Sequence, residues 1–116
     1  MLNAKVLNRN NEAYELDIMQ AIDWSVSIHT TDVINLSLGI SRICDGSCPL
    51  CETVDAASEF AMVVAAAGNE GPALDTINCP GNASMAITVG ACEKDEILDF
   101  SSRGSENKDK PNLVAP

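Results

Sequence analysis

Met62-Val-Val-Ala-Ala-Ala-Gly-Asn-Glu-Gly-Pro72 places an uninterrupted apolar run directly before a turn. The small and β-branched residues from Val63 to Ala67 predict a strand, and the lack of alternating polar residues predicts that both of its faces are covered. Gly-Asn-Glu-Gly-Pro ends the strand. Ligands of open α/β sheets bind beyond the carboxyl ends of the strands, so Asn69 is a candidate binding residue.

Strand and helix patterns alternate on both sides of this segment. Periods of two and of 3.6 residues distinguish the strands from the helices. Alternating strands and helices indicate an α/β fold with a mostly parallel sheet. The expected elements are a strand over Leu2–Leu7, a helix over Glu15–His29, a strand over Val33–Leu38, a helix over Glu52–Phe60, a strand over Ala86–Ala91, and short extended pieces over Leu98–Ser101 and Asn112–Ala115.

The composition excludes some classes of partner. The chain has 116 residues, enough for one domain with a single core. It carries 17 acidic and 7 basic residues, a net charge of −10 at pH 7. A nucleic-acid partner needs clustered Lys and Arg, so we expect none. No apolar run approaches the roughly 20 residues of a membrane span, so we expect no membrane partner.

Five cysteines are an odd number, so at least one has no partner within the chain. Cys44, Cys48 and Cys51 cluster in a loop with Gly46 and Pro49. A tetrahedral zinc site normally has four ligands, and neither a histidine nor a second C-x-x-C pair lies nearby in the sequence. We therefore expect free or locally paired thiols, with no metal and no cofactor in this chain. A structural metal at the three cysteines is the alternative.

Six segments follow one another in a recognisable order. They are Val33-Ile-Asn-Leu-Ser-Leu-Gly39, Val64-Ala-Ala-Ala-Gly-Asn-Glu-Gly-Pro72, Cys79-Pro-Gly-Asn-Ala83, Ile87-Thr-Val-Gly-Ala91, Phe100-Ser-Ser-Arg-Gly104 and Lys110-Pro-Asn-Leu-Val-Ala-Pro116. Each is weak alone, but all six in order are specific. On these segments the chain resembles the subtilisin-like serine proteases, the subtilases, over nearly its whole length. The resemblance implies a three-layer α/β/α fold, here incomplete at both ends.

The resemblance also implies roles for individual residues. Asn69 would donate its side-chain amide to the oxyanion of the tetrahedral intermediate. The other residues would bind a peptide or protein substrate, whose backbone pairs with an edge strand and whose side chain before the scissile bond enters a pocket. The edge strand would be Ser37, Leu38 and Gly39, and the pocket would be lined by Ala66, Ala67, Gly68 and Asn78. Parent enzymes of this kind are often secreted and can carry calcium, although the first residues here show no signal-peptide pattern.

The family's three triad motifs are absent from this sequence. A serine protease of this class needs a nucleophilic Ser, a His base and an Asp that orients the His. His29 ends an amphipathic helix and is expected at the surface, while Ser101 and Ser102 are interpreted as hydrogen-bonding turn residues. We therefore expect residues 1–116 to be the central part of a catalytic domain, inactive alone, with the rest of that domain as a partner.

The sequence leaves two other functions as alternatives. A non-catalytic peptide-binding module, or a degenerate homologue, would hold extended peptides along Ser37–Gly39 without cutting them. A nucleotide-binding domain fits the order of elements but lacks G-x-G-x-x-G, a P-loop lysine and a basic groove. If residues 1–116 come from a larger sheet, their strands keep open edges. We therefore expect this chain to self-associate.

Overall fold

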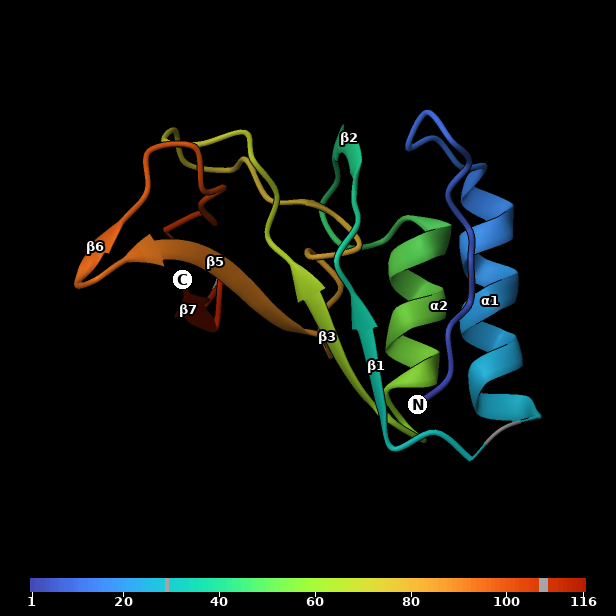
Figure 1. Cartoon of the computed structure of the whole chain (residues 1–116). Coiled ribbons are helices and arrows are strands. Elements are labelled where there is room, and N and C mark those ends of the chain that lie inside the picture. Colours follow the sequence, from blue (N-terminus) through green and yellow to red (C-terminus); the bar gives the residue numbers. More distant parts are fainter. Residues whose placement is uncertain (29, 107–108) are drawn as a thin grey trace.

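The structure, a computed structural model, describes residues 1–28, 30–106 and 109–116. His29, which was expected at the surface, lies outside the described residues. Figure 1 shows the order of the elements along the chain. They are α1 (Glu15–Ser27), β1 (Val33–Leu36), β2 (Ile40–Ile43), α2 (Pro49–Ala57), β3 (Met62–Ala66), β4 (Asn78–Cys79), β5 (Ile87–Glu93), β6 (Glu96–Ile97) and β7 (Leu113–Ala115).

The main sheet is parallel, as the sequence predicts. β3 lies between β1 and β5, and β7 pairs with β5 in the same direction. Only β6 runs antiparallel to its neighbour β5. Because β1 and β3 are parallel neighbours, with Leu36 opposite Ala65, their carboxyl ends meet at one edge of the sheet. The α/β class with a parallel sheet is confirmed.

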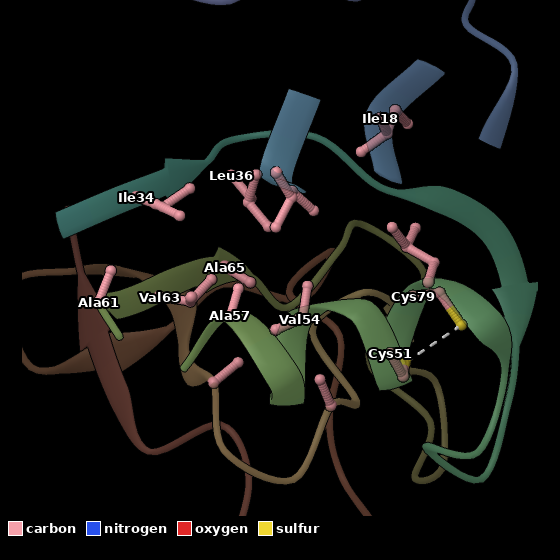
Figure 2. Packing of buried hydrophobic residues seen from close by; sticks show 14 residues of the cluster. Ile18, Ile34, Leu36, Cys51, Val54, Ala57, Ala61, Val63, Ala65 and Cys79 are labelled. Carbon is pink, nitrogen blue, oxygen red and sulfur yellow. Dashed lines mark hydrogen bonds between the residues drawn. The ribbon is translucent and has the colours of Figure 1, made fainter. Parts of the chain in front are cut away.

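One face of the sheet packs against both helices. Side chains at alternate positions of β1 and β3 point into the core, where they meet apolar residues of α1 and α2 (Figure 2). This alternation follows from the two-residue period of a strand. The buried residues include Ile18 and Ile22 of α1, Leu50, Cys51, Val54 and Ala57 of α2, and Ile34, Leu36, Val63 and Ala65 of the strands.

The other face of β1 and β3 is open in this chain. Val33 and Met62, which are opposite each other in the register, are each 54% exposed, and Val64 is half-buried. The prediction that β3 is covered on both faces is therefore wrong for the described residues. An apolar run predicts that both faces of a strand are buried. It does not show that residues 1–116 contain the element that buries the second face.

The N-terminal segment is not the predicted strand. Residues 1–7 form no ladder with another described strand, and the chain runs alongside α1 (Figure 1). Val6 packs against the core, but Leu2 is exposed. A strand is stable only with a hydrogen-bonding neighbour, and the described chain supplies none here.

The predicted extended piece Leu98–Ser101 is a turn. In it, the Ser101 N–H donates to the Leu98 carbonyl at 3.0 Å.

A second, small sheet was not predicted. β2 and β4 pair antiparallel, with Ile40 opposite Cys79.

Helix α2 begins at Pro49, three residues before its predicted start, with Cys48 as its N-cap. Proline suits the first turn of a helix because the N–H that it lacks would have no partner there. Among the described residues, no helix combines the length and the hydrophobicity needed to cross a bilayer.

Candidate functional site

The candidate site lies where β1 and β3 leave the sheet. Ser37 directly follows β1, and Ala67 follows β3. Leu36 and Ala65 are the last paired residues of the two strands. The segments that follow β1 and β3 therefore leave the sheet side by side. The Ala67 N–H donates to the Val89 carbonyl of β5 at 2.9 Å, which extends the sheet by one residue. The fold thus brings together the two segments that the sequence assigns to substrate binding.

Gly68 allows the turn that follows β3. Its φ angle of 109° lies in the left-handed region, which residues with a Cβ atom rarely adopt. A Cβ atom on Gly68 would also lie 2.9 Å from both the Asn78 Nδ2 atom and the Ser102 Oγ atom. A side chain at Gly68 would therefore collide with its neighbours. Glycine is thus required at residue 68 for two reasons, its positive φ angle and the lack of space for a side chain.

Asn78 lies beside this turn and is buried, with 6% of its surface exposed. Its backbone N–H donates to the Ala67 carbonyl at 3.0 Å. A Cβ atom on Gly39 would be 3.7 Å from the Asn78 Cβ atom, so Gly39 also approaches it. The buried Oδ1 atom of Asn78 has no hydrogen-bond partner among the described residues.

Asn69 is exposed on the turn just beyond Gly68. The segment Phe100–Ser102 supports this turn. The Glu70 N–H donates to the Ser102 hydroxyl at 3.0 Å, and the Ser102 N–H donates to the Gly68 carbonyl at 3.0 Å. The Gly71 N–H completes the contact by donating to the Phe100 carbonyl at 2.9 Å. An exposed amide is thus presented on a turn whose backbone is fixed on both sides of it.

The interpretation of Ser101 and Ser102 as hydrogen-bonding residues is confirmed. Both side chains are fully buried. The Ser101 hydroxyl accepts from the Ala91 N–H at 3.0 Å, and the Ser102 hydroxyl accepts from Glu70. What the sequence does not reveal is that Ser102 supports the turn that carries Asn69. Its position 33 residues after Asn69 gives no local signal.

Three other predicted site residues have different surroundings. The hydroxyl of Ser37 is exposed and lies 3.0 Å from the side-chain nitrogen of Asn35. Leu38 is half-buried and packs against the core, where it lines a cavity of about 790 Å³ beside α1. Ala66 lies on the open face of β3 and is half-buried. Leu38 therefore anchors the segment Ser37–Gly39, and only its neighbours are exposed.

The sequence holds one histidine, His29, which lies outside the described residues. Neither buried serine of the segment Phe100–Ser102 is accessible to a substrate. A nucleophile with its base is therefore not formed by the described part of this chain. What the arrangement does supply is an exposed amide donor beside an exposed segment of backbone.

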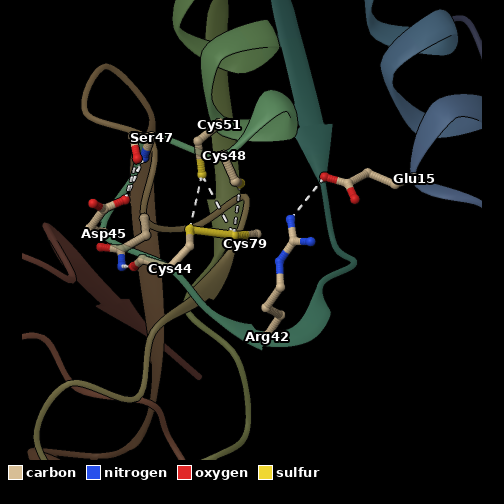
Figure 3. Close-up of a disulfide and its surroundings, with 9 residues drawn as sticks. Glu15, Arg42, Cys44, Asp45, Ser47, Cys48, Cys51 and Cys79 are labelled. Carbon is tan, nitrogen blue, oxygen red and sulfur yellow. Dashed lines mark hydrogen bonds and ion pairs between the residues drawn. A yellow bond between two sulfur atoms is a disulfide. The ribbon is translucent and has the colours of Figure 1, made fainter.

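The cysteine loop is arranged differently from its prediction. Cys44 forms a disulfide with Cys79, 35 residues away, so the expected local pairing is wrong. Cys48 and Cys51 are free thiols beside that disulfide (Figure 3), and Cys92 is free elsewhere. Burial raises the pKa of the Cys51 thiol to about 12, and a hydrogen bond to Cys48 adds to the rise. The sequence missed Cys79 as a neighbour because β2 and β4 were not predicted.

Arg42 connects this cluster to α1. Its guanidinium lies 3.0 Å from the Glu15 carboxylate (Figure 3). A hydrogen bond to Cys48, followed by the charge of Glu15, raises the pKa of Arg42. A permanent positive charge therefore lies at the edge of the cysteine cluster.

Comparison with known proteins gives a consistent match. The family model described as the subtilase family, Peptidase S8, matches residues 1–116. Serine protease AprX of Bacillus subtilis (strain 168) is 32% identical over 136 residues, covering 100% of this chain and 31% of AprX. Subtilisin E of the same strain is 39% identical over 106 residues, covering 88% of this chain and 27% of subtilisin E.

Solved structures agree with the sequence matches. A cold adapted subtilisin-like serine proteinase superimposes with a TM-score of 0.79 at 26% identity, covering 97% of this chain. The match covers 39% of that proteinase. The chain thus spans well under half the length of the relatives that it matches.

Proposed function

The chain belongs to the subtilase family, and from this membership we propose that it forms the oxyanion-binding and substrate-binding part of a serine endopeptidase. The observation that carries the proposal is the position of Asn69. It is exposed at the carboxyl end of β3, beside the segment Ser37–Gly39, on a turn that Ser102 fixes. The rest of the catalytic domain would supply the nucleophilic Ser, the His and the Asp.

In the proposed reaction, the serine attacks the carbonyl carbon of a peptide bond. The carbonyl oxygen then acquires negative charge, and the Asn69 amide donates a hydrogen bond to it. A donor that is already oriented costs no reorganisation when the charge develops. The contacts from Ser102 to Glu70 and Gly68 support this role because they restrict the backbone on both sides of Asn69.

The substrate is proposed to be an extended peptide. Its backbone would pair with the exposed segment that contains Ser37 and Gly39, which adds a strand to the sheet. The side chain before the scissile bond would lie against Ala66, Ala67 and Gly68. Asn78 lies next to this pocket, with its backbone N–H donating to the Ala67 carbonyl at 3.0 Å.

Substituting Asn69→Ala in the full-length protein tests the proposal. We expect kcat for a peptide substrate to fall by about 10²–10³, the loss known for such a donor in the relative subtilisin, with KM little changed. Asn10→Ala is the matched control, because Asn10 is also exposed but lies in the N-terminal turn. Unchanged turnover in Asn69→Ala would remove Asn69 from the oxyanion site.

A peptide-binding module without catalysis is the second candidate. It is favoured by one observation, that residues 1–116 contain none of the family's three triad motifs. Isothermal titration of the full-length protein with uncleaved peptides, together with labelling by a fluorophosphonate probe, separates the two functions. Binding without covalent labelling supports the module, whereas labelling supports the endopeptidase.

A further inference from the structure

Four cysteines from separate parts of the chain converge in one place. Cys44 follows β2, Cys48 caps α2, Cys51 lies in the first turn of α2, and Cys79 ends β4 (Figure 3). We propose that these four cysteines bind a single zinc ion when the disulfide between Cys44 and Cys79 is reduced. The proposal rests on the geometry of the sulfur atoms and is independent of the proposed peptidase function.

The sulfur atoms lie at the spacing that one metal ion requires. All four Sγ atoms are within 4.8 Å of one another. The Cys44–Cys51, Cys48–Cys79 and Cys51–Cys79 Sγ atoms are 3.6, 3.1 and 3.8 Å apart. Zinc–sulfur bonds of about 2.3 Å in a tetrahedron place the sulfur atoms about 3.8 Å apart. Small side-chain rotations are therefore enough to form the tetrahedron.

The scaffold around the cluster also suits a metal thiolate. Cys51 and Cys79 are completely buried, whereas Cys44 lines a surface cavity of about 370 Å³ that gives an ion a path inward. Zinc with four thiolates carries two negative charges. The N-terminus of α2, which begins at Pro49, presents its positive end to these charges, and the Arg42 guanidinium lies beside Cys48.

The loop between the first two cysteines is held in shape. The Asp45 carboxylate accepts hydrogen bonds from the N–H and the hydroxyl of Ser47. Gly46 has a φ angle of 97°, and a Cβ atom there would lie 2.7 Å from the Asn82 carbonyl oxygen. The side chain of Asn82 in turn donates to the Cys44 carbonyl. Because these contacts fix the loop, the positions of Cys44 and Cys48 are set before a metal binds.

The two states of the cluster are related by a balanced reaction. A dithiol reductant supplies two electrons and two protons to the Cys44–Cys79 disulfide and is itself oxidised to a disulfide. Zinc then binds the four thiols and displaces four protons. A tetrahedral set of four sulfur ligands is the arrangement typical of structural zinc. The rival arrangement is a second disulfide between Cys48 and Cys51.

The test is metal analysis of the full-length protein purified in a thiol reductant without chelator. We expect about one zinc per chain by elemental analysis, as a closed four-cysteine site requires. Cys48→Ser and Cys51→Ser are expected to lose the zinc, and Cys92→Ser is the matched control because Cys92 is a buried free thiol outside the cluster. Iron in place of zinc, or zinc retained by both ligand variants, would overturn the assignment.

Cobalt substitution of the wild-type protein keeps the test valid if the variants do not fold. Tetrahedral cobalt with four thiolates has strong visible bands and thiolate-to-cobalt charge-transfer bands in the near ultraviolet, and we expect both. If the reduced protein takes up no cobalt or zinc and mass spectrometry finds two disulfides after reoxidation, the proposal is wrong.

Discussion

The hydroxyl group of Ser102 is one of the contacts that hold the turn carrying Asn69. It accepts the N–H of Glu70, the residue next to Asn69, from a position far along the sequence. Gly68 lies directly against the Ser102 Oγ atom, so the turn has little room to relax. The orientation of the candidate oxyanion donor thus depends on a buried serine that is not itself part of the site.

Substituting Ser102→Ala in the full-length protein should lower both stability and turnover. The Glu70 N–H loses its acceptor, so we expect the free energy of unfolding to fall by about 1–3 kcal/mol and kcat to fall because Asn69 is less fixed. Ser101→Ala is the control, because its hydroxyl is equally buried but accepts from Ala91. We expect it to lose similar stability and keep its kcat. Equal kcat values in the two variants would contradict the role of Ser102.

A side chain of helix α2, that of Asp55, bonds to the loop after β4. The Asp55 carboxylate accepts hydrogen bonds from the Ser84 N–H at 3.2 Å, the Ser84 hydroxyl at 2.7 Å and the Met85 N–H at 2.7 Å. The same helix carries Cys48 and Cys51 at its other end. The position of α2 therefore connects the cysteine cluster to the loop that leads into β5.

Asp55→Ala should destabilise the fold through this connection. Hydrogen bonds to a charged group contribute about 1.5–3 kcal/mol, and we expect a loss of that size in chemical denaturation. Glu59→Ala is the control, since Glu59 is an exposed acidic residue just beyond α2 and its side chain bonds to no described residue. If both variants unfold at the same denaturant concentration, the Asp55 contacts contribute nothing measurable.

Local sequence patterns predicted most strands of the main sheet. They did not predict the segments that pack around it, such as the small sheet of β2 and β4. The strands β1, β3, β5 and β7 and the position of Asn69 follow from apolar runs and turn residues within a few positions of each other. Several of the failures involve partners distant in the sequence. Leu2–Leu7 looks like a strand but lacks a neighbour, and β4 has two residues, too few to form a pattern. Cys79 could be placed beside Cys44 only once β2 and β4 were known to pair.

In the described part of the chain, the helices leave an apolar surface of the main sheet uncovered. Val33 and Met62 are neighbours on the open face of the sheet, and β1 forms an edge with no further strand among the described residues. Exposed apolar faces and unpaired edges both favour association. We propose that the rest of the catalytic domain covers this face in the full-length protein. The net charge of −10 acts in the opposite sense by keeping separate chains apart.

The 116-residue chain alone should therefore self-associate, and more strongly at high salt. Salt screens the repulsion between acidic chains without weakening apolar contacts. Sedimentation velocity at low and high ionic strength measures the effect. The double variant Val33→Lys, Met62→Lys should shift the chain toward monomer, because it places charges on the open face. Strictly monomeric wild-type chain at both salt concentrations would contradict this prediction.

The link between Cys44 and Cys79 encloses the chain that contains β3, Gly68 and Asn69. The turn at Asn69 is exposed, so a protease in the surroundings can reach the chain there. A cut anywhere between residues 44 and 79 would leave the two fragments covalently joined while the disulfide is intact. The turn that carries Asn69 would thus stay attached to the domain after nicking. The disulfide keeps a cut at this exposed turn from separating the chain into two pieces.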